Sequence, residues 1–273
     1  MRLRNAVVLT LVLVALAGAG CSRVAFVKTD PSRKGFTQVA EPVVVHDTDA
    51  SRQRGAALNA LDMSQQRLAE GDVAAAEQYA HKALKLDPQS ADAYTLLAVI
   101  ADRKGQSVDA GANYQRAATL APQDGGALNN YGTWLCTNGH AAESLAWFDR
   151  ALLDPSYPTP AAAQANAGRC ALDAGQVDRA RRDLRQAIER DPQNPVALEA
   201  LARLALRTGS YMEARAFSER RLASAPATAE ALLLASQIED KLGDSAAAAR
   251  YVRRLREEFP GFAQGNAGGS KSP

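Results

Sequence analysis

Small side chains recur at two places in the apolar pattern of this chain, with a period of about 34 residues. One set comprises Ala76, Ala110, Ser144, Ala180, Ala214 and Ala248, and the other comprises Ser64, Ala98, Gly132, Gly168, Ala202 and Ser236. A glycine lies between each residue of the second set and the next residue of the first set: Gly71, Gly105, Gly139, Gly175, Gly209 and Gly243. A proline follows each glycine about 17 residues later: Pro88, Pro122, Pro155, Pro192, Pro226 and Pro260. Glycine tolerates the positive φ with which a chain leaves a helix, and proline cannot continue one. The pattern predicts six helix-turn-helix units whose paired helices cross closely at the small residues.

These units resemble the tetratricopeptide repeat, a helix-turn-helix unit of about 34 residues. The resemblance covers residues 55–260 and implies an all-α fold, a right-handed superhelical solenoid of six repeats. One helix pair cannot bury its own apolar face, so neighbouring repeats must stack on it. The composition agrees, because 47% hydrophobic but only 5% aromatic residues are typical of helices packed through alanine and leucine.

The first 21 residues have the pattern of a secretion signal. Arg2 and Arg4 precede an apolar stretch over residues 6–20, which is shorter than the roughly 18 residues that a membrane-spanning helix needs. Small residues then precede Cys21, which resembles the lipobox of bacterial lipoproteins, where the thiol is acylated with fatty acids such as palmitate. The competing interpretation is ordinary cleavage after Ala19, which would leave no lipid.

On the lipoprotein interpretation the chain divides into four parts. Residues 1–20 are the signal peptide, residues 21–54 are the lipidated N-terminus and a flexible tether, residues 55–260 are the repeats, and residues 261–273 are a disordered tail. Ser22 is not the aspartate that keeps such lipoproteins in the inner membrane. The resemblance therefore implies anchoring to the outer membrane, on its periplasmic face.

The charged and nucleophilic residues do not suggest chemistry. His46, His81 and His140 have no carboxylate or cysteine at ligand spacing, so we expect neither a metal site nor a catalytic group. No glycine-rich phosphate loop is present, and we expect no cofactor, no small-molecule substrate and no enzymatic activity. The net charge of +2, from 32 basic and 30 acidic residues, gives no indication of nucleic-acid binding.

Cys136 and Cys170 lie 34 residues apart, in the first helices of the third and fourth predicted repeats. Neighbouring repeats stack side by side, and an exported chain meets an oxidising compartment, so a disulfide between them is conceivable. The alternative is a pair of small buried thiols in the core.

Four stretches of the chain resemble the type IV pilus biogenesis and stability lipoproteins, the PilW family of secretin pilotins. They are the Asn-Asn-Tyr-Gly sequence at 129–132, the Tyr-Pro loop at 156–160, and residues 166–172 and 255–260. The resemblance implies a protein that binds the pilus secretin, promotes its outer-membrane localisation and multimerisation, and supports pilus stability and twitching motility. Two other interpretations stay open: a lipoprotein adaptor for cell-wall enzymes or β-barrel assembly, and a periplasmic enzyme regulator without a lipid.

The same resemblance places the secretin-binding groove on the first repeat. Four positions of its first helix are expected to face that groove: Leu58, Leu61, Gln65 and Leu68. The core positions of this helix are then expected to be filled by Ala60, Met63, Ser64 and the stem of Arg67, which leaves the leucines for a partner.

Replacement of Cys21 by serine tests the lipid anchor. Because the repeats do not depend on acyl groups, we expect Cys21→Ser to give a folded protein that separates from outer membranes during fractionation. Quantitative sedimentation of the variant with the outer membrane would contradict this prediction.

Overall fold

The computed structural model describes residues 48–262, and over that range the chain is an array of helices. Twelve helices are present in the described range, and no strand is found among its residues. In chain order they are α2 Asp49–Ala69, α3 Val73–Leu86, α4 Ala91–Arg103, α5 Ser107–Leu120, α6 Gly125–Thr137, α7 Ala141–Ala151, α8 Pro160–Asp173, α9 Val177–Arg190, α10 Pro195–Arg207, α11 Tyr211–Ser224, α12 Ala229–Leu242 and α13 Ser245–Glu258.

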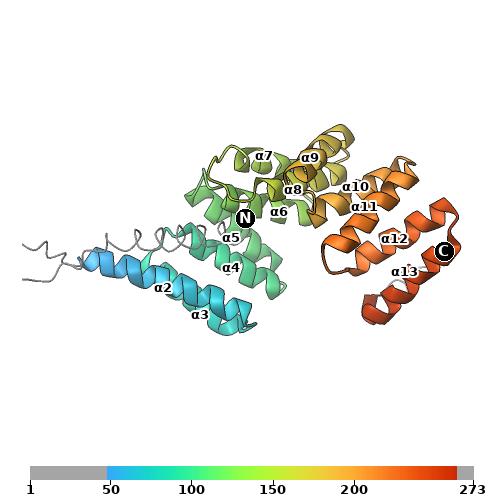
Figure 1. The fold of residues 1–273 in the computed structure, drawn as a ribbon. Coiled ribbons are helices and arrows are strands. Elements are labelled where there is room, and N and C mark those ends of the chain that lie inside the picture. Colours follow the sequence, from blue (N-terminus) through green and yellow to red (C-terminus); the bar gives the residue numbers. More distant parts are fainter. Residues whose placement is uncertain (1–47, 263–273) are drawn as a thin grey trace, which may run out of the picture. The chain divides into compact units, whose positions relative to one another are not determined.

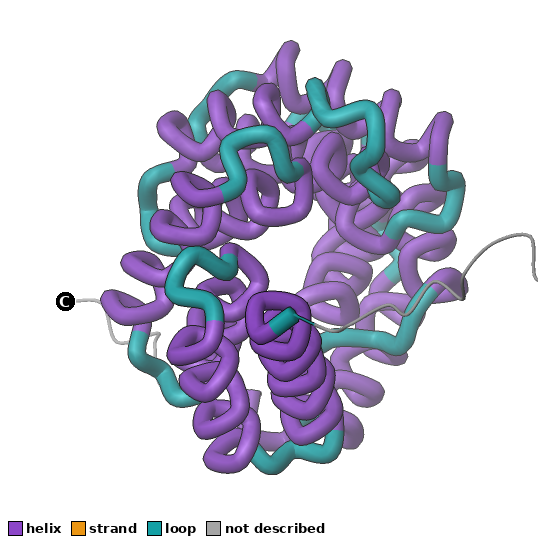
Figure 2. Tube along the Cα trace, turned by 90° about the vertical axis from the view of Figure 1, so that its left-hand side faces the viewer, coloured by secondary structure: helices purple, strands orange, loops and turns teal. Residues whose placement is uncertain are grey.

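Consecutive helices form six pairs, from α2 with α3 to α12 with α13, and each second helix packs on the first helix of the next pair. Figure 1 shows the pairs following one another along the chain, and Figure 2 shows them winding around a common axis. Successive first helices also contact one another, whereas successive second helices contact one another far less within residues 48–262. The first helices therefore form the inner face of the curve. The predicted all-α solenoid of six repeats is confirmed.

Local sequence signals determine where the helices end. The six turn glycines have φ between +72° and +89°, the left-handed region predicted for them. Several helices begin with a side chain that accepts a hydrogen bond from the backbone N–H three residues later, as Asp72 does from Ala75 at 3.0 Å. The same cap is made by Thr48, Ser90, Asp124, Asn194, Thr228 and Asp244.

The paired helices cross where the small residues were expected. Ser64 is completely buried, and its hydroxyl donates to the carbonyl oxygen of Ala76 at 2.8 Å. At Gly168 the second helix comes so close that an added Cβ would lie 2.5 Å from Leu184 Cγ and 3.0 Å from its backbone nitrogen. The core consists of successive clusters, each shared between neighbouring repeats.

The two extra residues between the third and fourth repeats belong to a loop outside the helices, residues 152–159. Asp154 accepts hydrogen bonds from the Ser156 hydroxyl at 2.7 Å and from the backbone N–H groups of Ser156 and Gly125 at 2.8 and 2.9 Å. These bonds lower the pKa of Asp154. Tyr157 packs over Gly125, where an added Cβ would lie 2.6 Å from the tyrosine ring. The loop thus holds the start of α6.

The predicted end of the tether at residue 54 needs correction. Helix α2 already begins at Asp49, because Thr48 caps it and Asp49 and Arg52 form an ion pair in its first turn. The final residues of the expected tether are therefore helical. The signal peptide, Cys21, His46 and residues 263–273 of the expected tail lie outside the described residues.

Gly168→Ala tests the close crossing between α8 and α9. The added methyl group has no room beside Leu184, so we expect a loss of about 1 to 3 kcal/mol in the free energy of unfolding, measured in urea. Gly55→Ala is the matched control, because nothing lies within 4 Å of its added Cβ and alanine favours a helix by up to about 1 kcal/mol. Equal stability of Gly168→Ala and the wild type would contradict the close crossing.

Candidate functional site

Helix α2 presents less apolar surface than the sequence suggested. Leu58 is 59% exposed and Gln65 is also exposed, but Leu61 and Leu68 are each only 7% exposed. These two leucines belong to the core cluster that α2 shares with α3 and α4. The expectation that three leucines of α2 stand open to a partner is therefore wrong for Leu61 and Leu68.

The geometry of the helix explains the difference. Successive residues turn by about 100°, so Leu61 and Leu68 lie only about 20° apart, and Ser64 lies beside them. Ser64 lies at the contact with α3, since its hydroxyl is hydrogen-bonded to Ala76. Residues three or four positions apart share one side of a helix, so Leu61 and Leu68 must face α3 as well. Leu58 is turned about 60° away from Leu61 and stays exposed. The small residue at position 64 was the signal that could have identified this buried stripe.

The expected core residues of α2 are only partly in the core. Ala60 and Ser64 are fully buried, as expected. Met63 and Arg67 are half-buried, and Arg67 forms an ion pair with Glu70 at 2.8 Å. The leucines occupy the space that Met63 and the arginine stem were expected to fill.

Farther along the array, the inner face carries polar side chains that link neighbouring repeats. Asn166 of α8 donates through Nδ2 to Asn129 Oδ1 at 3.1 Å and to Thr133 Oγ1 at 3.3 Å, both on α6. In the second repeat Asp102 contacts Tyr114, and burial together with this carboxylate raises the pKa of Tyr114. Polar side chains of the first helices thus link the third repeat to the fourth, and a carboxylate contacts a tyrosine within the second.

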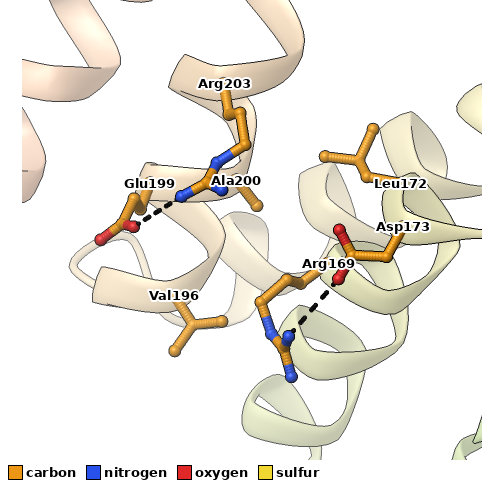
Figure 3. A pocket seen from close by; sticks show the side chains of 7 residues that line it. All are labelled: Arg169, Leu172, Asp173, Val196, Glu199, Ala200 and Arg203. Carbon is orange, nitrogen blue, oxygen red and sulfur yellow. Dashed lines mark hydrogen bonds and ion pairs between the residues drawn. The ribbon is translucent and has the colours of Figure 1, made fainter. Parts of the chain in front are cut away.

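A pocket of about 240 Å³ opens on this face between α8 and α10 (Figure 3). It is lined by Arg169, Leu172, Asp173, Val196, Glu199, Ala200 and Arg203. Leu172 and Ala200 are each 4% exposed and form an apolar floor, while Val196 is 37% exposed at the rim. The charged residues surround that floor.

Ion pairs within each helix hold the charged side chains of the pocket. Arg169 lies 3.6 Å from Asp173 on α8, and Arg203 lies 3.1 Å from Glu199 on α10. Glu199 also lies 3.4 Å from Arg221 Nε of α11, and Arg221 is 6% exposed. The sequence pattern did not identify this pocket, because the pocket combines residues from two repeats.

A disulfide joins the third and fourth repeats. Cys136 of α6 and Cys170 of α8 are bonded, with their Cα atoms 5.8 Å apart. Of the two alternatives left open by the sequence, the structure contains the bridge. It fixes the two helices on whose inner face Asn129 and Asn166 meet.

Within residues 48–262 no three His, Cys, Asp or Glu side chains lie together as metal ligands. His81 is exposed, and His140 lies 3.8 Å from Glu143 at the surface. No helix in the described part of the chain is long and apolar enough to cross a bilayer.

Comparisons with known proteins identify the repeats and two relatives from pilus systems. Family models of the tetratricopeptide repeat match residues 61–125 and 171–238. One solved structure similar to this chain is the crystal structure of PilW, described as a widely conserved type IV pilus biogenesis factor. The two sequences are 30% identical, and the match covers 75% of this chain and 94% of the PilW chain, with a TM-score of 0.68. The type IV pilus assembly protein PilF of Pseudomonas aeruginosa is 28% identical over 195 residues, 71% of this chain and 77% of PilF.

A third relative shares only part of its length with this chain. The cellulose synthase operon protein C of Pseudomonas fluorescens is 30% identical over 192 residues, which are 68% of this chain. The match spans about 15% of that much longer protein.

The disulfide predicts a measurable dependence of stability on the redox state. For a closed loop of 34 residues we expect the double variant Cys136→Ser and Cys170→Ser to lose about 3 to 4 kcal/mol in the free energy of unfolding. Dithiothreitol should lower the melting temperature of the wild type and leave the melting temperature of the double variant unchanged. Insensitivity of the wild-type melt to complete reduction would overturn this expectation.

Proposed function

The chain belongs to the tetratricopeptide-repeat proteins of type IV pilus biogenesis, and we propose that it binds the pilus secretin and promotes its outer-membrane localisation and multimerisation. The observation that carries the proposal is the similarity to PilW, which extends over 94% of that structure at 30% identity. A tetratricopeptide-repeat fold is a scaffold for binding other proteins. In this proposal the chain acts by binding energy and by its position in the cell.

The proposed anchor is a lipid on Cys21. Several acyl chains make attachment effectively permanent, whereas a single chain gives only marginal binding to a bilayer. Ser22 favours delivery to the outer membrane in the proposal. The repeats would then meet the secretin monomer at the periplasmic face of that membrane, where the monomers assemble.

The proposed contact on the first repeat is narrower than a stripe of three leucines. Leu58 and Gln65 are the exposed members of the predicted groove, and Leu61 and Leu68 support them from the core. Burial of a leucine such as Leu58 against a partner would contribute roughly 1.5 to 3 kcal/mol. A single exposed leucine on a rigid helix is thus enough to influence affinity strongly.

Leu58→Glu tests this contact in a strain that makes type IV pili. Because Leu58 is already 59% exposed, we expect a normal thermal melt and normal abundance, but loss of secretin multimers on gels and of twitching motility. Met212→Glu is the matched control, since Met212 is 66% exposed on a second helix and should affect neither readout.

A third variant separates binding from folding. Leu61→Glu places a charge in the core, so its melt should fall by many degrees. If Leu58→Glu leaves both multimers and motility normal, the proposed contact is wrong.

A further inference from the structure

The pocket between α8 and α10 lies on other repeats than the proposed contact at Leu58, and the proposed secretin binding makes no use of it. We infer that it binds the carboxylate side chain of an aspartate or glutamate in an extended peptide segment of a partner protein. The inference rests on the proposed function only in that the chain binds proteins. It is carried by the charges, the size and the surroundings of the pocket.

The charges in and directly behind the pocket favour an acid. Two arginines and two carboxylates line it, namely Arg169, Arg203, Asp173 and Glu199. The buried Arg221 of α11, outside the lining, adds a third guanidinium that also contacts Glu199. Glu199 lies between Arg203 and Arg221, at 3.1 and 3.4 Å, so its single charge is divided between two arginines. One more carboxylate would complete the set.

The two arginines of the rim have capacity left for a ligand. A guanidinium carries five N–H donors, and each of these arginines has one ion-pair contact within residues 48–262. The side chain of Arg169 is 31% exposed and that of Arg203 is 49% exposed. Asp173 is a weak competitor, because it is 49% exposed and 3.6 Å away from Arg169. An incoming carboxylate can therefore bind without breaking a buried pair.

The size of the pocket suits a side chain. At about 240 Å³ it is smaller than the roughly 300 to 1,000 Å³ of small-molecule sites. The methylene groups of an acidic side chain would lie on the floor of Leu172 and Ala200, beside Val196 (Figure 3). The apolar floor and the charged rim thus match the two halves of a glutamate side chain.

The neighbouring part of the inner face fits the backbone of such a peptide. Asn166 lies one turn before Arg169 on α8 and is bonded to Asn129 and Thr133 of α6. Within residues 48–262 the side-chain amides of Asn129 and Asn166 make no other hydrogen bond. The side-chain NH₂ of Asn129 can therefore still donate, and the side-chain oxygen of Asn166 can still accept. Helices pack about 8 to 10 Å apart and an extended chain advances about 3.3 Å per residue. About six residues would therefore reach from α6 to α10.

The test uses the purified full chain and a positional-scanning library of fluorescein-labelled hexapeptides. The peptides are acetylated and amidated at their ends. We expect fluorescence anisotropy to show selection of Asp or Glu at one position. Arg169→Gln and Arg203→Gln should each weaken the selected peptide about tenfold or more, since each removes a charged hydrogen-bond donor. Arg207→Gln, at the end of α10 and outside the pocket, makes the same charge change and should bind as the wild type does.

A gain-of-binding variant guards against misfolding. Asp173→Asn removes the competing carboxylate of Arg169 and should tighten the selected peptide by about threefold or more. Absence of binding, selection of basic or apolar residues alone, binding only to peptides with a free C-terminal carboxylate, or unchanged affinity of both arginine variants would overturn the inference. No secretin is present in this assay, so its outcome is independent of the multimer assay on Leu58→Glu.

Discussion

The close approach of two helices at a pair of small side chains is the contact on which every repeat depends. Ser64 donates to the backbone of Ala76 at such a crossing, and Leu184 fills the space that a Cβ on Gly168 would need, so little space remains there. Such an approach buries the apolar stripe on each side of the crossing, and neighbouring repeats then cover what one pair leaves exposed. The core is continuous because this contact is repeated at nearly constant spacing.

The same spacing creates the inner face. First helices from successive repeats lie beside one another, so residues about one repeat apart become neighbours there, as Asn129 and Asn166 do. Cys136 and Cys170 add a covalent link at that level of the array. The two extra residues between these repeats are accommodated in a loop in which Tyr157 packs over Gly125. The insertion therefore lies outside the helices that form the inner face.

Charge is distributed unevenly along this face, with consequences for what it can bind. In the first repeat an exposed leucine stands above a core of leucine and alanine, which suits an apolar contact. In the fourth and fifth repeats, ion pairs surround a small apolar floor, which suits a side chain with both an apolar stem and a charge. One array can thus contact separate parts of a partner in chemically different ways.

The sequence alone determined the features that depend on residues within one repeat. The turn glycines, the prolines and the small residues at the crossings act locally, so their period was enough to predict six helix pairs. Only the tertiary structure decided which side of α2 is buried, because Leu61 and Leu68 are covered by α3 and α4. It also shows that Cys136 and Cys170 form a disulfide and are not free thiols, and that Arg169 lines the same pocket as Glu199. The physical reason is that these contacts join residues of different helices, whose distances depend on how the helices stack and not on their separation along the chain.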